Sequence, residues 1–254
     1  MKLSECTCLV TGTSRGIGRA LAEELSERGA RVLAATRDGA HAPAGPAIEP
    51  VALDLSTRET IDSGLDDLGS RLREVDVLVN NAGSFTAGQL ETQELGKIYE
   101  LIQVNLAGLI HVTSRVLPLM LERDSGKIVN HSSFVAYVHF PGLSTYAASK
   151  AGVTAFTECL RRELEDTGVN TLEIVTGGVD TEMLQGAAKD LDEHTDPSGW
   201  QWMEPDDWAA QIADAIEQDK QTLQPPGKAR IGKTMASLPA FVLDTLSERG
   251  FERR

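Results

Sequence analysis

Short runs of β-branched and apolar residues alternate with helical patterns along most of this chain, and this alternation limits the possible folds more than any other feature. The runs expected to form strands are Cys6–Thr11, Arg31–Ala35, Ile48–Leu53, Val75–Val79, Lys127–His131 and Asn170–Thr176. Helical spacing covers Gly16–Arg28, Thr57–Arg73, Glu94–Glu122 and Tyr146–Thr167. Strands separated by helices pair in parallel and are covered on both faces. We therefore expect an α/β chain with a doubly wound central parallel sheet of about seven strands.

One connection in this pattern differs from the others. Asp38–Pro50 holds three Pro and two Gly in thirteen residues, a composition that opposes a helix. We expect an irregular connection there, or one short helical turn. No low-complexity linker divides the chain, and 254 residues suit one domain, so residues 1–254 are expected to form a single domain.

Charge and cysteine content narrow the classes of function. The net charge is −14 with a pI near 4.8, so the chain repels nucleic-acid phosphates and anionic lipid. No apolar run approaches the length of a membrane span, and Met1–Leu9 is too short and polar for a signal peptide. Three cysteines, an odd number, favour a reducing compartment and no disulfide framework. We expect a cytoplasmic protein without a metal site.

A glycine motif follows the first expected strand. Thr11–Gly18 reads TGTSRGIG and opens the first expected helix. Gly12 allows a tight turn, and Gly16 and Gly18 allow the backbone to approach a pyrophosphate at the helix N-terminus. The alternative is a plain glycine-rich turn. The loop residues expected to contact a dinucleotide are Gly12, Ser14, Arg15, Gly16, Ile17 and Gly18.

Two arginines bear on which dinucleotide binds. NAD sites usually place an acid about 20 residues past the glycines, on the ribose 2′-hydroxyl. Here Thr36 occupies the corresponding position, Arg37 follows it, and Arg15 lies in the glycine loop. Two guanidiniums can hold a 2′-phosphate by charge-assisted hydrogen bonds, so NADP(H) is favoured over NAD(H). Alternatively both arginines face solvent, and Asp38 could pair with Arg37.

A tyrosine and a lysine are spaced for one face of a helix. Tyr146 and Lys150 are four residues apart in YAASK. The segment follows a strand that ends in Ser132-Ser133, and Ser133 lies thirteen residues before the tyrosine. Ser132, Ser144 and Ser149 could also be taken for the serine that acts with Tyr146, and the resemblance given next is what selects Ser133 by its spacing.

Together these motifs resemble the short-chain dehydrogenase/reductase family, in its shorter single-domain branch. The resemblance covers about residues 3 to 183 and implies a Rossmann-type fold. A slight resemblance to hydroxysteroid and retinol dehydrogenases is also present. The matching positions are TGTSRGIG at Thr11–Gly18, Asp54 after the third strand, NNAG at Asn80–Gly83, Asn105 in VNLAG, and Ser133, Tyr146 and Lys150.

The resemblance implies an oxidoreductase that interconverts a ketone or aldehyde and an alcohol by hydride transfer from or to a nicotinamide. Tyr146 is the expected general acid for reduction and base for oxidation. The Lys150 cation, one turn away, is expected to lower the pKa of that phenol from about 10. Ser133 is expected to hydrogen-bond the carbonyl oxygen. Asn105 is expected to hold a water for proton relay, or else to satisfy a helix kink.

Further cofactor contacts are implied by the same resemblance. Asp54 matches the acid that binds the adenine amino group, although it could be only a turn or cap residue. Thr181 matches the residue that contacts the nicotinamide carboxamide. The full set expected beyond the glycine loop is Arg37, Asp54, Leu55, Asn81, Ala82, Gly83, Tyr146, Lys150, Val179 and Thr181.

The chain departs from the family pattern after the sixth expected strand. Thr176 stands where the family usually has Pro, and Gly178 follows, so we expect a looser loop there. His131 and His139 lie close to the expected site in sequence. Both are expected to be structural, because Tyr146 already supplies the acid and base.

The remaining expectations concern substrate and assembly. Residues 182–208 are expected to form a substrate lid, or alternatively a packed surface loop, and residues 249–254 a flexible tail. The partner is expected to be a small-molecule carbonyl or alcohol, and a hydrophobic substrate is one form that this partner could take. A homodimer or homotetramer is expected through the helices around Asn105 and Tyr146. A non-catalytic dinucleotide-binding sensor or scaffold is the alternative function.

Overall fold

The fold is described from a computed structural model for residues 1–179 and 203–225. A parallel sheet of seven strands has the order β3-β2-β1-β4-β5-β6-β7. The strands are β1 (Thr7–Thr11), β2 (Arg31–Thr36), β3 (Ile48–Ala52), β4 (Val75–Asn80), β5 (Gly126–Ser133), β6 (Val169–Thr176) and β7 (Thr222–Leu223). The order reverses beside β1, so the predicted doubly wound Rossmann-type sheet is confirmed.

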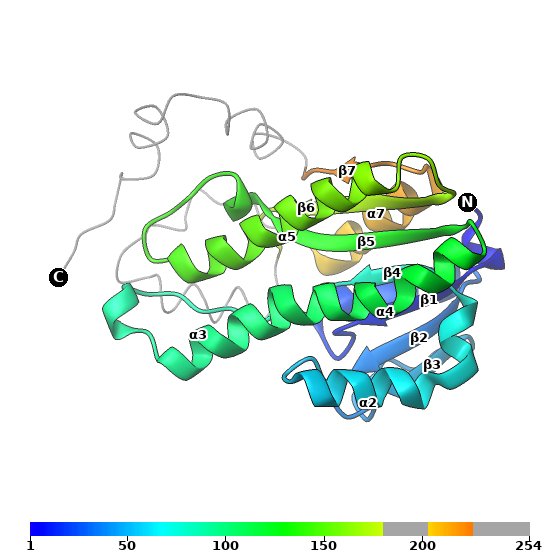
Figure 1. Ribbon diagram of the computed structural model, residues 1–254, viewed down its shortest axis with the longest axis horizontal. Coiled ribbons are helices and arrows are strands. Elements are labelled where there is room, and N and C mark those ends of the chain that lie inside the picture. Colours follow the sequence, from blue (N-terminus) through cyan, green and yellow to red (C-terminus); the bar gives the residue numbers. More distant parts are fainter. Residues whose placement is uncertain (180–202, 226–254) are drawn as a thin grey trace.

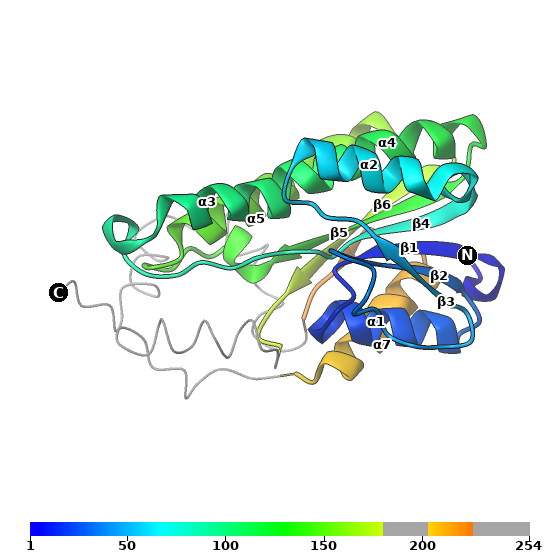
Figure 2. The same ribbon diagram turned by 90° about the horizontal axis from the view of Figure 1, so that it is seen from below.

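Helices cover both faces of the sheet (Figures 1 and 2). One face carries α1 (Gly16–Glu27) and α7 (Pro205–Glu217). The other carries α2 (Arg58–Leu68), α4 (Leu109–Glu122) and α5 (Ser144–Glu163), and α3 (Leu95–Ile102) extends from that layer. No helix joins β2 to β3, which confirms the irregular connection predicted from the prolines and glycines between them.

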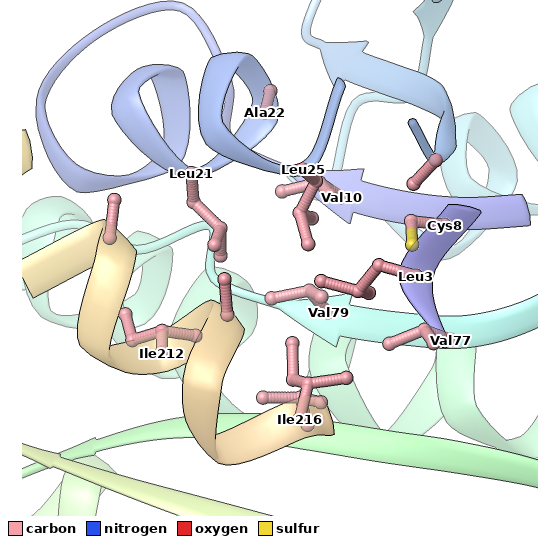
Figure 3. Packing of buried hydrophobic residues seen from close by; sticks show 14 of the residues in the cluster. Leu3, Cys8, Val10, Leu21, Ala22, Leu25, Val77, Val79, Ile212 and Ile216 are labelled. Atoms are coloured by element: carbon pink, nitrogen blue, oxygen red, sulfur yellow. The ribbon is translucent and has the colours of Figure 1, made fainter. Parts of the chain in front are cut away.

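Two apolar clusters hold these layers together. In the first, Leu21 and Leu25 of α1 and Ile212 and Ile216 of α7 pack under Val79 and its neighbours in the sheet (Figure 3). These side chains are all fully buried. The second cluster joins the opposite face of the sheet to α2, α4 and α5. The sheet is thus fixed between two apolar layers, and its carboxyl edge is left to carry polar residues.

Element boundaries differ clearly from expectation at three helices. One is α5, which covers Ser144–Glu163 where Tyr146–Thr167 was expected. The helix expected to continue to Arg73 ends at Leu68, because Gly69 has a φ of +54° and a 3₁₀ segment, Gly69–Glu74, follows. The helix expected over Glu94–Glu122 is interrupted by a π-helical turn, Gln103–Gly108, that separates α3 from α4. A π-turn widens the helix locally and is frequent at functional sites.

Within the described part of the chain, one helical stretch is long and apolar enough to cross a membrane by length and composition. It is Leu95–Glu122, with a mean hydropathy of 1.4 over its best window. The expectation that no run approaches membrane length was therefore too strict. Core helices pass the same test, and Val112, Val116 and Met120 of this stretch pack in the second cluster, so it is weak evidence for a span.

Two expectations concern segments that lie mostly or wholly outside the described residues. Of the expected lid, only residues 203–208 are described, and the expected tail, 249–254, lies wholly outside them. Met203 pairs with Val179 in an isolated parallel bridge, and its amide donates to Gly178 O at 3.1 Å. Trp208 is fully buried at the start of α7. The lid and the tail stay predictions.

Candidate active site

The glycine loop has the close approaches that its sequence predicts. Gly12 has a φ of +73°, and a Cβ there would lie 2.6 Å from Ala82 Cα. A Cβ on Gly18 would lie 2.2 Å from Gly12 O. Arg15, at the N-cap of α1, makes no side-chain cap hydrogen bond, so the first amides of the helix are not capped by that side chain. The loop therefore has the shape and dipole that suit a phosphate.

Asn81 fixes this loop to the neighbouring strand. Its side-chain amide donates to Thr11 O at 3.0 Å and to Gly12 O at 3.2 Å. The backbone amides of Asn81 and Ala82 both donate to Thr11 Oγ1 at 3.0 Å. The side chain of Asn81 thus holds the loop against the end of β4, and the backbones of Asn81 and Ala82 lie beside the loop. Gly83 lies instead toward the Tyr146 side of the site, where an added Cβ would be 3.3 Å from Asn105 Oδ1 and 3.9 Å from Lys150 Nζ.

Ser133, Tyr146 and Lys150 are brought together at the end of β5 and the start of α5. Lys150 Nζ lies 5.8 Å from the centroid of the Tyr146 ring and donates to His131 O at 2.8 Å. The Ser133 hydroxyl lies close enough to the Tyr146 phenol to lower its pKa, and its Oγ donates to Thr176 O at 3.4 Å. The choice of Ser133 as the serine that acts with Tyr146 stays a prediction.

The pKa values at this cluster differ from the sequence expectation. Burial raises the pKa of Tyr146 to about 12, and the hydrogen bond with Ser133 opposes that rise. The expected lowering below the ordinary tyrosine value is wrong for this structure, because burial of the phenol disfavours its charged form. Burial also lowers the pKa of Lys150 to about 8. At neutral pH the phenol is protonated, which suits a proton donor.

His131 links the glycine loop to β6 and α7. Its Nδ1 lies 2.9 Å from Asn81 Oδ1, its Nε2 contacts Thr176 Oγ1, and Trp208 Nε1 donates to the same oxygen at 3.0 Å. The Asn81 amide nitrogen donates to two carbonyls, so the amide oxygen faces the histidine and accepts from a proton on Nδ1. The indole N–H can only donate, so Thr176 Oγ1 accepts from Trp208 and donates its own proton to Nε2. His131 is therefore neutral and protonated at Nδ1. Burial and the Lys150 charge lower the pKa of His131 to about 3. A neutral, fully bonded ring agrees with the expected structural role.

Thr176 makes contacts that a proline at this position could not make. Its hydroxyl joins β6 to the histidine of β5 and to the indole of α7. The sequence led us to expect a looser chain here. The structure anchors Thr176 by its side chain, and the looser loop expected at Gly177 and Gly178 stays a prediction.

Asn105 lies buried in the π-turn and uses both ends of its amide. Its Oδ1 accepts from Ser84 N at 2.7 Å, and its Nδ2 donates to Ser84 O at 3.0 Å and to Ser149 Oγ at 3.1 Å. The side chain thus joins the segment after NNAG to α5, at the π-turn where a kink role was the alternative. The expected water-holding role stays a prediction.

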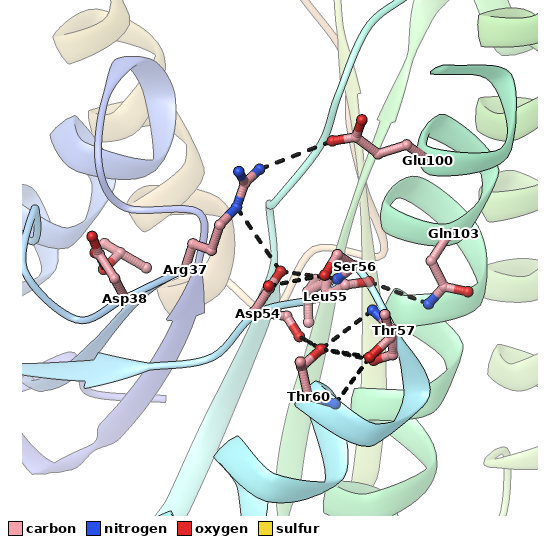
Figure 4. Close-up of polar contacts among 10 residues, drawn as sticks. Arg37, Asp38, Asp54, Leu55, Ser56, Thr57, Thr60, Glu100 and Gln103 are labelled. Carbon is pink, nitrogen blue, oxygen red and sulfur yellow. Dashed lines mark hydrogen bonds and ion pairs between the residues drawn. The ribbon is translucent and has the colours of Figure 1, made fainter. Parts of the chain in front are cut away.

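Arg37 at the end of β2 faces two carboxylates (Figure 4). Its Nε lies 3.9 Å from Asp54 Oδ1, and one of its terminal nitrogens lies 4.0 Å from Glu100 Oε1. Asp38 instead accepts from Ala40 N at 3.0 Å, so the described ion pairs of Arg37 do not include Asp38. Arg37 is 74% exposed. Long ion pairs on an exposed side chain hold it weakly, so the guanidinium can reorient.

Asp54 has contacts of a turn residue as well as its contact with Arg37. Its Oδ1 accepts from Ser56 N at 3.0 Å, and its Oδ2 accepts from Ser56 Oγ at 2.9 Å. These bonds close a turn after β3 and place the carboxylate beside the loop where Leu55 lies. The position of Asp54 thus fits a turn residue, and its role in binding the adenine amino group stays a prediction. Thr181, the last expected contact, lies outside the described residues.

The comparison with protein-family models decides the family. The model described as short chain dehydrogenase matches residues 6–192. The chain belongs to this family. The family's motif residues are those that the structure gathers at the carboxyl edge of the sheet, where open α/β sheets bind ligands.

Individual members of the short-chain dehydrogenase family are similar over most of the chain. A 3-oxoacyl-[acyl-carrier-protein] reductase of Haemophilus influenzae is 34% identical over 182 residues, which are 70% of this chain and 75% of that protein. A short chain dehydrogenase from Burkholderia cenocepacia, in complex with NADP, matches with a TM-score of 0.83 and 26% identity, over 97% of this chain and 98% of that one. A 3-ketoacyl-(acyl-carrier-protein) reductase from Brucella melitensis, complexed with NADH, has a TM-score of 0.79 and 26% identity, over 90% and 100%.

This short-chain dehydrogenase also has site residues that sequence reasoning missed. Phe85 packs its ring against Tyr146, and Glu100 faces Arg37. Phe85 lies two residues after the NNAG motif, which could have marked it as close to the site. No sequence signal connects it to a tyrosine 61 positions later, since that contact depends on how the loop crosses α5.

Proposed function

We propose that this short-chain dehydrogenase reduces a ketone or aldehyde to an alcohol, and catalyses the reverse oxidation, with NADP(H). The observation that carries the proposal is the convergence of Ser133, Tyr146 and Lys150 beside a glycine loop at the N-terminus of α1. The similarity to reductases of 3-oxoacyl groups supports the class of reaction.

The residues of the site divide the work of a reduction. When bound, the nicotinamide supplies the hydride to the carbonyl carbon. Tyr146 gives the phenolic proton to the carbonyl oxygen, and its raised pKa keeps that proton available at neutral pH. Ser133 donates a hydrogen bond to the same oxygen as charge develops on it. Lys150, with a pKa near 8, is suited to return a proton toward the phenol.

The glycine loop and its surroundings fit a dinucleotide. Side chains at Gly12 and Gly18 would clash with Ala82 and Gly12, so only glycine fits at these positions of the loop that leads into the N-terminus of α1. Asp54 and Arg37 lie at the ends of β3 and β2, on the side expected for the adenosine. Val179, beside the end of β6, is on the side expected for the nicotinamide.

The preference for NADP(H) rests on Arg37 and Arg15. Arg37 is exposed and held only by pairs of 3.9 and 4.0 Å, so a 2′-phosphate can replace Asp54 and Glu100 as its partner. Both cofactors occur among similar structures, with NADP in the Burkholderia protein and NADH in the Brucella reductase.

Oxidation of NADPH and of NADH, followed with a panel of aldehydes, ketones and a 3-oxoacyl thioester, tests both parts of the proposal. We expect turnover with at least one carbonyl and a lower KM for NADPH. Arg37→Asp should move the preference toward NADH by about tenfold, since an acid repels the phosphate and accepts from the ribose hydroxyl. Tight dinucleotide binding without any turnover would favour the sensor or scaffold instead.

We also propose a cytoplasmic homodimer or homotetramer that acts on a small carbonyl or alcohol. Tyr99 and Leu95 of α3 are exposed large apolar side chains, and Ala148 and Ala155 form an exposed small-residue face of α5. Such faces suit close helix packing between copies. Light scattering of the eluted protein measures the oligomer, and a monomer at micromolar concentration would contradict this part.

A further inference from the structure

Phe85 lies against the proposed proton donor. The centroids of the Phe85 and Tyr146 rings are 4.7 Å apart, and the ring planes are tilted by 57°. Tilted aromatic pairs at this separation attract each other beyond the area they bury. The contact therefore both covers part of the phenol ring and favours one orientation of it.

The chain on both sides of Phe85 is fixed by hydrogen bonds. Before it, Ser84 exchanges two backbone bonds with the Asn105 amide, at 2.7 and 3.0 Å. After it, Thr86 Oγ1 lies 2.9 Å from Oγ1 of Thr145, the residue directly before Tyr146. The Phe85 backbone is thus tied to the π-turn on one side and to the first turn of α5 on the other.

Few groups other than Phe85 face the phenol among the described residues. Ser133, at the end of β5, lies close enough to lower its pKa. Lys150, on α5, lies 5.8 Å from its ring centroid and donates to His131 O. His131 itself is neutral and bonded to other residues. Phe85 is the apolar ring in contact with Tyr146, and it contributes to the burial that disfavours the phenolate.

We propose that Phe85 positions the Tyr146 phenol and limits the size of the carbonyl substituent that lies on its side of that phenol. The proposal rests on the proposed role of Tyr146 as proton donor. A carbonyl that accepts this proton must come within hydrogen-bond distance of the phenolic oxygen. One of its two substituents then meets the Phe85 ring, whose backbone is held in place by the bonds at Ser84 and Thr86. The substrates favoured are aldehydes and ketones with one small substituent, such as methyl.

The first test measures the phenol itself and needs no substrate. The chain has three tyrosines, so ¹³Cζ-tyrosine NMR resolves each, and Tyr146→Phe assigns the signal. In Phe85→Ala and Phe85→Leu we expect the Tyr146 signal to begin its titration about one pH unit lower than in wild type, because water reaches the phenol. Phe156→Ala, the same truncation at a half-buried position farther along α5, is the matched control and should leave the titration unchanged. An unchanged titration in folded Phe85→Ala would overturn the positioning role.

The second test measures substrate choice with NADPH. The kcat/KM for butyrophenone relative to acetophenone should rise at least fivefold in Phe85→Ala, while Phe85→Tyr, which keeps the ring, retains the wild-type ratio. NADPH affinity should stay unchanged in all three proteins. A ratio that stays constant in Phe85→Ala would overturn the size limit. Absence of any turnover in wild type would overturn the proposed function, whereas the tyrosine titration would still decide whether Phe85 covers the phenol.

Discussion

At the scale of single residues, the site contains a buried charge whose desolvation is unfavourable. Lys150 is almost fully buried, and its hydrogen-bond acceptor within residues 1–179 and 203–225 is the backbone carbonyl of His131, not a carboxylate. Its pKa is lowered from 10.5 to about 8, so keeping its proton in the folded state opposes folding. Groups that are placed for chemistry commonly reduce stability in this way.

This cost predicts that Lys150→Met stabilises the protein while it abolishes carbonyl reduction. Because the folded pKa is lower than the unfolded value, the unfolded state binds more protons between about pH 8 and 10.5. The penalty is therefore fully present below pH 8 and disappears as the pH rises through that window. We expect urea unfolding at pH 7 to show about 2 kcal/mol more stability in the variant, and a smaller difference at pH 9.5. A variant less stable than wild type at pH 7 would contradict this account.

At the scale of elements, side chains at the strand ends determine how β5, β6 and α7 meet. The Thr176 hydroxyl donates to His131 and accepts from Trp208, so two buried polar groups depend on it. Thr171, on the same strand, is also buried, but its hydroxyl has no hydrogen-bond partner in the described part of the chain. The strand thus carries one bonded and one unbonded threonine hydroxyl.

These two threonines give a matched pair of substitutions. Thr176→Val removes a hydroxyl and leaves two buried partners unsatisfied, so we expect a loss of about 1–3 kcal/mol in the free energy of unfolding. Thr171→Val removes an unbonded hydroxyl and should be neutral or stabilising. Denaturant unfolding of both variants checks this. Equal losses in the two would show that the His131 and Trp208 bonds contribute nothing.

The glycine loop gives a second comparison at this scale. In Gly18→Ala the new Cβ would lie 2.2 Å from Gly12 O and 2.3 Å from the Asn81 amide nitrogen, so the loop must move. We expect loss of nucleotide binding and about 1–3 kcal/mol of stability. Gly96→Ala, in α3 with nothing within 4 Å of the new Cβ, should stabilise by about 0.5–1 kcal/mol. Fluorescence titration with NADPH and thermal unfolding separate the two outcomes, and intact NADPH binding in Gly18→Ala would argue against the loop's role.

At the scale of the whole molecule, the sequence predicted the sheet well and the site less completely. Strand and helix alternation is a local pattern, so the parallel sheet and the helix-free connection before β3 followed from it. The Tyr146–Ser133 contact was also accessible, because both residues sit at element ends with a fixed spacing. The contacts of Phe85 and Glu100 depend on how separate elements cross, and the raised pKa of Tyr146 depends on burial, which no local pattern encodes.

The central claim is that Tyr146 gives the proton that completes carbonyl reduction. The most direct measurement is the single-turnover rate of NADPH oxidation in wild type and Tyr146→Phe, with NADPH affinity measured in the same samples. We predict a rate lower by about 10²–10⁴-fold, the range for loss of a positioned general acid, with affinity unchanged. Full turnover in Tyr146→Phe would contradict the account.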